Sequence, residues 1–325
     1  MKIKSRIAVL FLFTLTFVLT VFGCVGMAAS PEEYYSIGMS YFELGKYEEA
    51  EVWLNRARSA DRTMVASQYN LGRLAYERKR YDEAAKLFEG ILARDPDNVL
   101  ALKAAAYTRI HTGDISIAEK HYTRLLELVP ESADDGYNHA LVLYAMERYS
   151  EAEKTLERYL IPLLENSDIQ LLYARSQGAQ NKAEAIDSYA KWLFNNTDAK
   201  VRSEYAHVLE HHELYARALE EYRKALTEVP DRNRTLKGEI HFGLARVLLI
   251  ADSASNAGIT ELQNAVNEGF NDIAAVEELL NRQNISAANR DSIRNIINNM
   301  RRTTETSNEQ KTQEEDSQTS DDNFD

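Results

Sequence analysis

Small and bulky apolar residues recur along the chain with a period of 33 or 34 residues. Every period holds a small residue, at Ala50, Ala84, Ala118, Ala152, Ala185 and Ala218. Four residues later, on the same face of a helix, stands a bulky one: Leu54, Phe88, Tyr122, Leu156, Tyr189 and Tyr222. A second small residue recurs upstream, at Gly38, Gly72, Ala106, Ala140, Ala206 and Gly243. The pattern predicts pairs of antiparallel helices, because the small residues let the two helices of a pair approach closely.

The ends of the units and their irregularities can also be located. Pro96, Pro130 and Pro230 follow three of the second helices, where proline stops a helix because it lacks an N–H donor. The fifth unit, residues 167–196, has a shortened turn and an uncertain helix register. In the seventh, Gly258 comes three residues later than its expected position, which we interpret as an insertion around residues 252–256.

The first unit carries the residues of a known repeat: Tyr34, Ile37, Gly38, Tyr41, Gly45, Tyr47, Ala50, Leu54 and Ala57. They match the aromatic, leucine–glycine, tyrosine, glycine, alanine, phenylalanine and alanine positions of the tetratricopeptide repeat, which the chain resembles over residues 31–270. The resemblance implies an all-α fold, a superhelix (α-α solenoid) of about seven helix hairpins. A single hairpin cannot bury its apolar face, so stability would come from stacking neighbouring units.

The C-terminal part lacks this period. Within residues 271–302, Ile293, Ile296, Ile297 and Met300 form one apolar stripe on an otherwise polar helix. A helix with one apolar face suits the exposed end of a solenoid, so we expect residues 271–302 to cap it. Residues 303–325 are acidic and polar without periodicity, and we expect them to form a disordered tail.

The N-terminus has the pattern of an export signal over residues 1–23, with a basic start followed by an apolar run. The only cysteine, Cys24, comes directly after it, and Val21-Phe22-Gly23-Cys24 resembles the lipobox of bacterial lipoproteins. In that family the thiol is lipidated and the cysteine becomes the new N-terminus. The resemblance implies a protein of the cell envelope that is attached to a membrane through its N-terminal lipid and faces the periplasm.

Other features of the N-terminus leave the localisation open. Val25 is not the aspartate that retains enterobacterial lipoproteins in the inner membrane, which slightly favours the outer membrane. Cleavage before Ala29 would instead release a soluble secreted protein, since residues 26–28 also form an acceptable site. A third alternative is that the apolar run stays uncut as an anchor, although it is short for a span of about 20 residues.

Composition excludes several classes of function. The formal net charge of −13 repels phosphate backbones, so we expect no nucleic-acid partner. A single cysteine allows neither an intrachain disulfide nor a cysteine-cluster metal site. The chain contains no Gly-rich phosphate loop and no G-x-S-x-G nucleophile elbow, so we expect neither an enzyme nor a bound cofactor.

The resemblance also implies where a protein or peptide partner would bind. In tetratricopeptide repeats the first helices line a concave groove, and ligand contacts come largely from positions 2, 5, 9, 12 and 13 of the unit. These positions hold Tyr35, Phe42, Tyr69, Arg73, Tyr76, Lys103, Tyr107, His111, Tyr137 and Tyr144. We therefore expect an aromatic stripe with Arg73 and Lys103 among the rings. The alternative is that these rings only fill the inner wall.

One motif suggests a metal. His207 and His211 frame Glu210 in the pattern H-x-x-E-H, which on a helix places two imidazoles and a carboxylate on one face. A catalytic zinc needs a third protein ligand and a pocket, so a polar patch in the groove is the simpler interpretation. The sequence thus favours a periplasmic scaffold that serves envelope assembly or transport machinery. The alternative is a small-ligand or metal-binding accessory protein that uses the His207/His211 face.

Overall fold

The computed structural model describes residues 29–160, 166–251, 256–282 and 285–303. The predicted signal, Cys24, the predicted tail beyond residue 303 and most of the predicted insertion lie outside these ranges. The chain divides into two compact units, Met1–Val142 and Leu143–Asp325.

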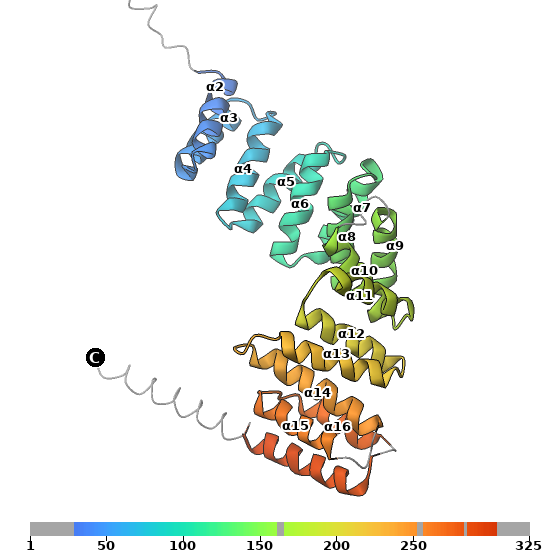
Figure 1. The fold of residues 1–325 in the computed structure, drawn as a ribbon. Helices are drawn as coiled ribbons and strands as arrows, with labels where there is room; N and C mark the ends of the chain where they lie inside the picture. Colours follow the sequence, from blue (N-terminus) through green and yellow to red (C-terminus); the bar gives the residue numbers. More distant parts are fainter. Residues whose placement is uncertain (1–28, 161–165, 252–255, 283–284, 304–325) are drawn as a thin grey trace, which may run out of the picture. The chain divides into compact units, whose positions relative to one another are not determined.

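The described part of the chain is helical throughout, and successive helices form antiparallel pairs (Figure 1). The first unit contains α2 Pro31–Glu43, α3 Tyr47–Ala60, α4 Val65–Glu77, α5 Tyr81–Leu92, α6 Val99–Thr112, α7 Ile115–Leu128 and most of α8 Ala133–Ala145. The second contains α9 Tyr149–Leu160, α10 Ser167–Ala179, α11 Glu184–Asn195, α12 Ala199–His211, α13 Tyr215–Glu228, α14 Arg234–Ala251, α15 Ala257–Asn267, α16 Ile273–Glu278, the 3₁₀ turn η1 Leu279–Asn281 and a helix over residues 287–303.

The recurring small residues act as predicted, by bringing two helices close together. A Cβ atom at Gly72 of α4 would lie 2.6 Å from the ring of Phe88 in α5, so only glycine fits there. Ala84, on the facing helix, is fully buried. In the irregular fifth unit the buried Ala174 takes the place of the small residue, one residue closer to Ala185 than the period predicts. The shortened turn therefore changes the spacing between the two helices while the packing contact is kept.

In the six pairs from α2/α3 to α12/α13, the turn between the two helices passes through a left-handed residue. These residues have φ between 57° and 80° and are Gly45, Lys79, Gly113, Glu147, Asn181 and Glu213. The N–H of the next residue closes the helix end, as in the 2.8 Å bond from Arg80 N to the Ala75 carbonyl. Glycine adopts this conformation at no steric cost and asparagine tolerates it, so the steric cost falls on Lys79, Glu147 and Glu213.

Ion pairs join consecutive helix pairs within each unit. In the first unit Glu51 of α3 accepts from Arg78 at 2.8 Å and from Arg80 at 3.0 Å. In the second unit Glu153 of α9 lies 2.6 Å from the ammonium of Lys182, at the start of the next second helix. Glu153 is almost fully buried, so this pair is shielded from solvent better than surface pairs are.

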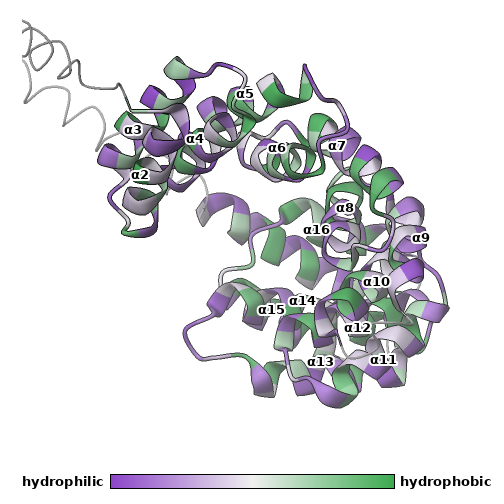
Figure 2. Cartoon of the chain, turned by 90° about the horizontal axis from the view of Figure 1, so that it is seen from above, coloured by the Kyte–Doolittle hydropathy of each residue, from purple (hydrophilic) through white to green (hydrophobic). Residues whose placement is uncertain are grey.

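The C-terminal helix over residues 287–303 buries the predicted apolar stripe. Ile293, Ile296, Ile297 and Met300 are all less than 9% exposed and pack against α14, α15 and α16. Its other residues are largely polar and exposed, an arrangement compatible with the capping role expected of this segment. Figure 2 shows the same division of most helices into an apolar and a polar side. None of the described helices is long and apolar enough to cross a membrane.

Candidate functional site

Four aromatic side chains meet in the first unit, where the ends of α4 and α6 approach the start of α5. Tyr76, Tyr81, Tyr107 and His111 form this tyrosine–histidine cluster. Tyr76 contacts the other three rings, with centroids 5.3 Å from Tyr81, 5.6 Å from Tyr107 and 5.4 Å from His111. Tyr81 stacks on His111 at 4.8 Å with an interplanar angle of 16°. Offset and edge-to-face contacts of this kind are favourable, so the rings hold one another in place.

Hydrogen bonding fixes the centre of the cluster. The hydroxyl of Tyr76 lies 2.8 Å from His111 Nε2. Burial, together with the neighbouring Tyr107 hydroxyl, raises the pKa of Tyr76 above its usual range. The phenol therefore stays protonated at neutral pH and can donate to the imidazole. Tyr107, in contrast, leaves 47% of its surface open to solvent.

A second group of predicted residues lies beside the cluster, on α2 and α4. The guanidinium of Arg73 lies over the ring of Phe42, 5.0 Å from its centroid. Its Nη1 donates to Asn70 Oδ1 at 3.1 Å, while Asn70 Nδ2 donates to the hydroxyl of Tyr35 at 3.0 Å. Because Asn70 is buried, this chain of contacts holds the exposed Arg73 side chain in a defined direction.

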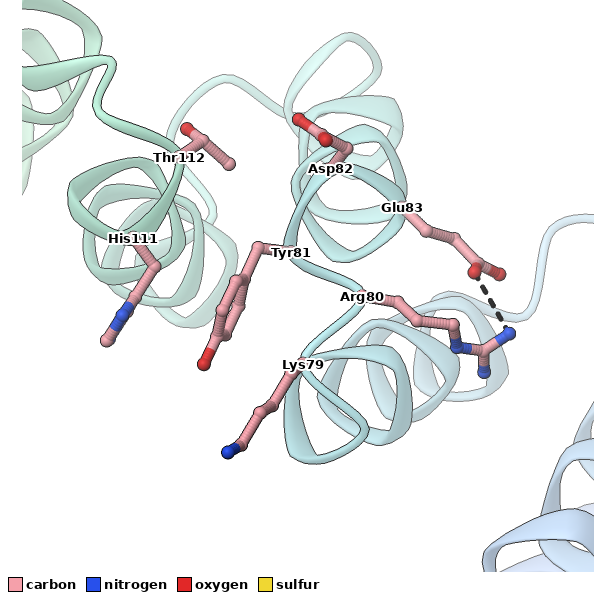
Figure 3. Close-up of a pocket in the computed structure, with 7 residues that line it drawn as sticks. All are labelled: Lys79, Arg80, Tyr81, Asp82, Glu83, His111 and Thr112. Atoms are coloured by element: carbon pink, nitrogen blue, oxygen red, sulfur yellow. Dashed lines mark ion pairs between the residues drawn. The ribbon is translucent and has the colours of Figure 1, made fainter. Parts of the chain in front are cut away.

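Two hollows border the cluster. The smaller, of about 140 Å³, is lined by Arg73, Tyr76, Glu77, Phe88, Ala104, Tyr107 and Thr108. The larger, of about 530 Å³, is polar and is lined by Lys79, Arg80, Tyr81, Asp82, Glu83, His111 and Thr112. Figure 3 shows Lys79, Tyr81 and His111 pointing to the same side of the larger hollow, while Arg80 turns away to pair with Glu83. Helices α4, α5 and α6 thus present a connected surface of rings, with Arg73 held beside it by Asn70 and Phe42.

Four of the predicted residues are not part of this surface. The ring of Tyr69 packs against Phe88 at 5.6 Å and contributes to the helix interface. Lys103 is not among the rings, because its ammonium pairs with the buried carboxylate of Asp135 at 2.9 Å. Tyr137 lies half-buried on α8.

Tyr144 belongs to the second unit, where its ring meets Tyr149 at 5.0 Å. Burial and the nearby Glu204 carboxylate raise the pKa of Tyr144. The aromatic surface of the first unit therefore does not include Tyr144, which forms a separate pair with Tyr149 in the second unit.

The carboxylate of the H-x-x-E-H motif forms an ion pair with an arginine of another helix. Glu210 is buried and accepts from Arg246 of α14 at 2.6 and 2.8 Å. Arg246 also lies 3.0 Å from His207 Nδ1, and the ring of His211 meets that of His212 with centroids 5.5 Å apart. Burial would raise the pKa of Glu210, but the hydrogen bonds from His207 and Arg246 outweigh it and lower the pKa to about 2. The guanidinium therefore neutralises the carboxylate that a divalent cation would need. In the described part of the chain, no group of three metal-binding side chains comes together.

Three residues that shape these sites were not predicted from the sequence: Asn70, Tyr81 and Arg246. Tyr81 could have been found. In three helix pairs an aromatic residue near the end of the first helix precedes, by five positions, a tyrosine that starts the second helix. These pairs are Phe42/Tyr47, Tyr76/Tyr81 and Tyr144/Tyr149, and the two rings of each pair are in contact. No comparable local pattern identifies Arg246, which lies 36 residues after Glu210.

Comparison with known proteins supports the repeat assignment. Models of the tetratricopeptide repeat match residues 35–99, 75–134 and 134–162. A mouse protein described as N-alpha-acetyltransferase 16, NatA auxiliary subunit, is 28% identical over 116 residues, which are 36% of this chain and 13% of that protein. An uncharacterized lipoprotein of Treponema pallidum (strain Nichols) is 26% identical over 140 residues, 43% of this chain and 71% of the relative. The chain thus spans only a small part of the mouse protein and most of the treponemal one.

Solved structures show the same architecture. A tetratricopeptide repeat protein from Parabacteroides merdae has a TM-score of 0.52 at 19% identity, covering 77% of this chain and 97% of that one. YrrB, described as a TPR protein with an unusual peptide-binding site, has a TM-score of 0.50 at 17% identity, covering 55% of this chain and 93% of its own. Tetratricopeptide repeats are therefore present, and the predicted all-α solenoid fold is confirmed.

Proposed function

We propose that this chain is a lipid-anchored protein of the bacterial cell envelope that binds an extended segment of a partner protein on the first helices of its N-terminal unit. The observation that carries the proposal is the tyrosine–histidine cluster, defined above as Tyr76, Tyr81, Tyr107 and His111. Its rings fix one another, yet Tyr107 remains 47% exposed. A ring that is held in place loses little entropy on binding, which makes it a good anchor for a peptide.

The fold and the relatives support a binding role over a catalytic one. Tetratricopeptide repeats are scaffolds, and the mouse and human NatA relatives are described as auxiliary subunits. YrrB is described as having a peptide-binding site, and its fold is that of this chain. We extend peptide binding to this chain because its own surface offers apolar rings and a positioned cation without a set of groups suited to a reaction.

The anchor and the localisation are part of the proposal. The lipobox-like segment that ends in Cys24 supports lipidation, and so does the description of the treponemal relative as a lipoprotein. With lipid on Cys24 the repeats would face the periplasm and be held at a membrane, with the outer membrane favoured by Val25. A tethered scaffold of this kind suits accessory roles in envelope assembly or transport.

Photo-crosslinking in cells tests the binding surface. We expect p-benzoylphenylalanine at position 107 to trap a partner, because this ring is exposed within the cluster. The same probe at position 52 is the control, since Val52 is 51% exposed on the second helix of the first hairpin and outside the cluster. Adducts in equal yield from both positions, or from neither, would reject the surface.

Metabolic labelling with radioactive palmitate tests the anchor. Lipid should enter the protein, and the Cys24→Ser variant should remain unlabelled and leave the membrane fraction. A mature protein that begins at Ala29 in mass spectrometry would instead identify a soluble secreted product, and would contradict the lipid anchor while leaving the binding surface untouched.

A further inference from the structure

We propose that the small hollow lined by Tyr76, Tyr107 and Phe88 receives one apolar side chain of the partner segment, and that Arg73 binds a carboxylate next to it on the same segment. The inference rests on the proposed function, since it specifies the chemistry of the ligand that the N-terminal unit would bind. It predicts a sequence preference in which an aliphatic or aromatic residue is accompanied by Asp or Glu.

The walls of the hollow fit an apolar side chain. Two tyrosine rings flank it, and Phe88 and Ala104 also line it. Its volume of about 140 Å³ is close to the roughly 150 Å³ of an apolar cavity that binds benzene. Ala104 leaves this space open, because any larger side chain at that position of α6 would project into it.

The core and the tyrosine–histidine cluster hold the walls of the hollow in place. Phe88 is fixed by close contact with Gly72, and Tyr76 is held by Tyr81 and His111. The space is therefore formed before a ligand arrives, so less binding free energy is spent on ordering the site.

Arg73 is the cation that lines the small hollow, and it has no carboxylate partner among the described residues. Neighbouring arginines are engaged, as Arg80 is with Glu51 and Arg109 with Glu89. Within the described ranges no carboxylate forms an ion pair with Arg73, although its side chain is held by Asn70 and lies over Phe42. A guanidinium offers its remaining N–H groups in a fixed fork that matches a carboxylate.

A second charge gives the ligand a direction. Glu77 lies one helical turn after Arg73 and also lines the hollow. A partner segment would therefore place its acidic residue on the Arg73 side of the apolar anchor, and a basic or neutral residue on the Glu77 side. Like charges in either place would be repelled, so the surface distinguishes the two orientations of the segment.

A library of random peptides displayed on phage, selected on the immobilised full chain in mild detergent, tests the inference. We expect enriched peptides to share an apolar residue with Asp or Glu at a fixed spacing. Peptides synthesised from the consensus should bind the wild-type chain, and replacement of either consensus residue by Ala should weaken binding by about tenfold or more.

Three variants assign the consensus to the residues named. Arg73→Glu should exchange the acidic preference for a basic one, and Ala104→Leu should remove the apolar preference by filling the hollow. Arg56→Glu is the matched control, because Arg56 is also exposed over an aromatic ring, at 4.4 Å from Trp53, but lies outside the hollow. Tyr107→Ala, at a half-exposed position that tolerates truncation, repeats the test if Ala104→Leu fails to fold.

The outcomes separate the two levels of the proposal. The expected shifts in Arg73→Glu and Ala104→Leu, with none in Arg56→Glu, establish the pocket. Peptides that bind the wild type with no shared apolar–acidic pair, or with a preference unchanged in both variants, overturn the pocket while the proposed function stands. Failure to enrich any peptide overturns both.

Discussion

Removing the arginine that fills the H-x-x-E-H motif should destabilise the second unit strongly. Arg246 donates to Glu210 at 2.6 and 2.8 Å and to the hydroxyl of Tyr222 at 3.2 Å. The side chain of Glu210 is only 8% exposed. The change to test is Arg246→Met, which keeps much of the length of the side chain but removes the charge and all of its donors.

The pKa of Glu210 sets the magnitude. Its ordinary value of 4.5 falls to about 2 in the folded chain, because the hydrogen bonds from His207 and Arg246 outweigh burial. A tenfold change in acidity is worth about 1.4 kcal/mol, so the charged carboxylate contributes about 3 kcal/mol of stability at neutral pH. Because the folded pKa is the lower one, this contribution is present above pH 4.5 and is lost as pH falls toward 2.

The size of the expected destabilisation depends on pH. Arg246→Met should lower the free energy of unfolding by about 3 kcal/mol at pH 7, as for other buried pairs that lose one partner. In the variant, burial would raise the pKa of Glu210, so lowering the pH to 4 should reduce the destabilisation by about 1 kcal/mol or more. The double variant Arg246→Met with Glu210→Leu should regain most of the loss.

Urea unfolding followed by the fluorescence of Trp192 measures this, since Trp192 and Tyr222 belong to the same buried cluster. The chain has only two tryptophans, so a Trp53→Phe background makes the signal specific to the second unit. Arg234→Met is the matched control: its ion pair with Glu268 is exposed, so its loss should cost less than about 1 kcal/mol. A similar cost for both variants, or a cost that does not change with pH, would refute the reasoning.

Two further predictions concern the repeats, and a third concerns the N-terminus. Gly72→Ala should lower the free energy of unfolding of the first unit by about 1–3 kcal/mol, because its Cβ would lie 2.6 Å from the ring of Phe88; an unchanged urea midpoint would contradict the close approach. Lys79→Gly should raise the free energy of unfolding of the first unit by about 0.5–1 kcal/mol, and Gly113→Ala should lower it by about 1 kcal/mol, since both turns need positive φ. Melting midpoints from circular dichroism that shift in the same direction in both variants would exclude this. Mass spectrometry of the envelope fraction should find an acylated Cys24 as the first residue, and an unmodified thiol would be the contrary result.

The sequence alone was sufficient for the architecture because the same packing constraint is repeated. Gly72 and Ala84 each had a counterpart about one period away, so a chance match at one position could not mislead the prediction. The stripe of Ile293 and Met300 was equally clear, since a helix with one apolar face has only one way to bury it.

The candidate site was only partly predictable. Tyr76, Tyr107 and His111 were expected on one wall and do come together. Lys103 was expected among the rings, but it pairs with Asp135, and the choice of partner for a flexible ammonium depends on distances between helices that no local pattern contains.

The metal hypothesis also depended on contacts between helices that the sequence of one helix does not contain. The H-x-x-E-H motif has the right spacing on one helix, but its environment is decided by Arg246, a residue of a different helix pair. Sequence motifs define what one helix can present, whereas the charge that faces it comes from the tertiary structure.

The ion pairs between consecutive helix pairs have a consequence for the order of the repeats. Glu51 with Arg80 and Glu153 with Lys182 occupy equivalent places three periods apart. One period after Arg80, the same place holds Asp114. If the first hairpin stacked on the third instead of the second, Glu51 would face a like charge, so wrong neighbours are rejected and the hairpins are not interchangeable modules.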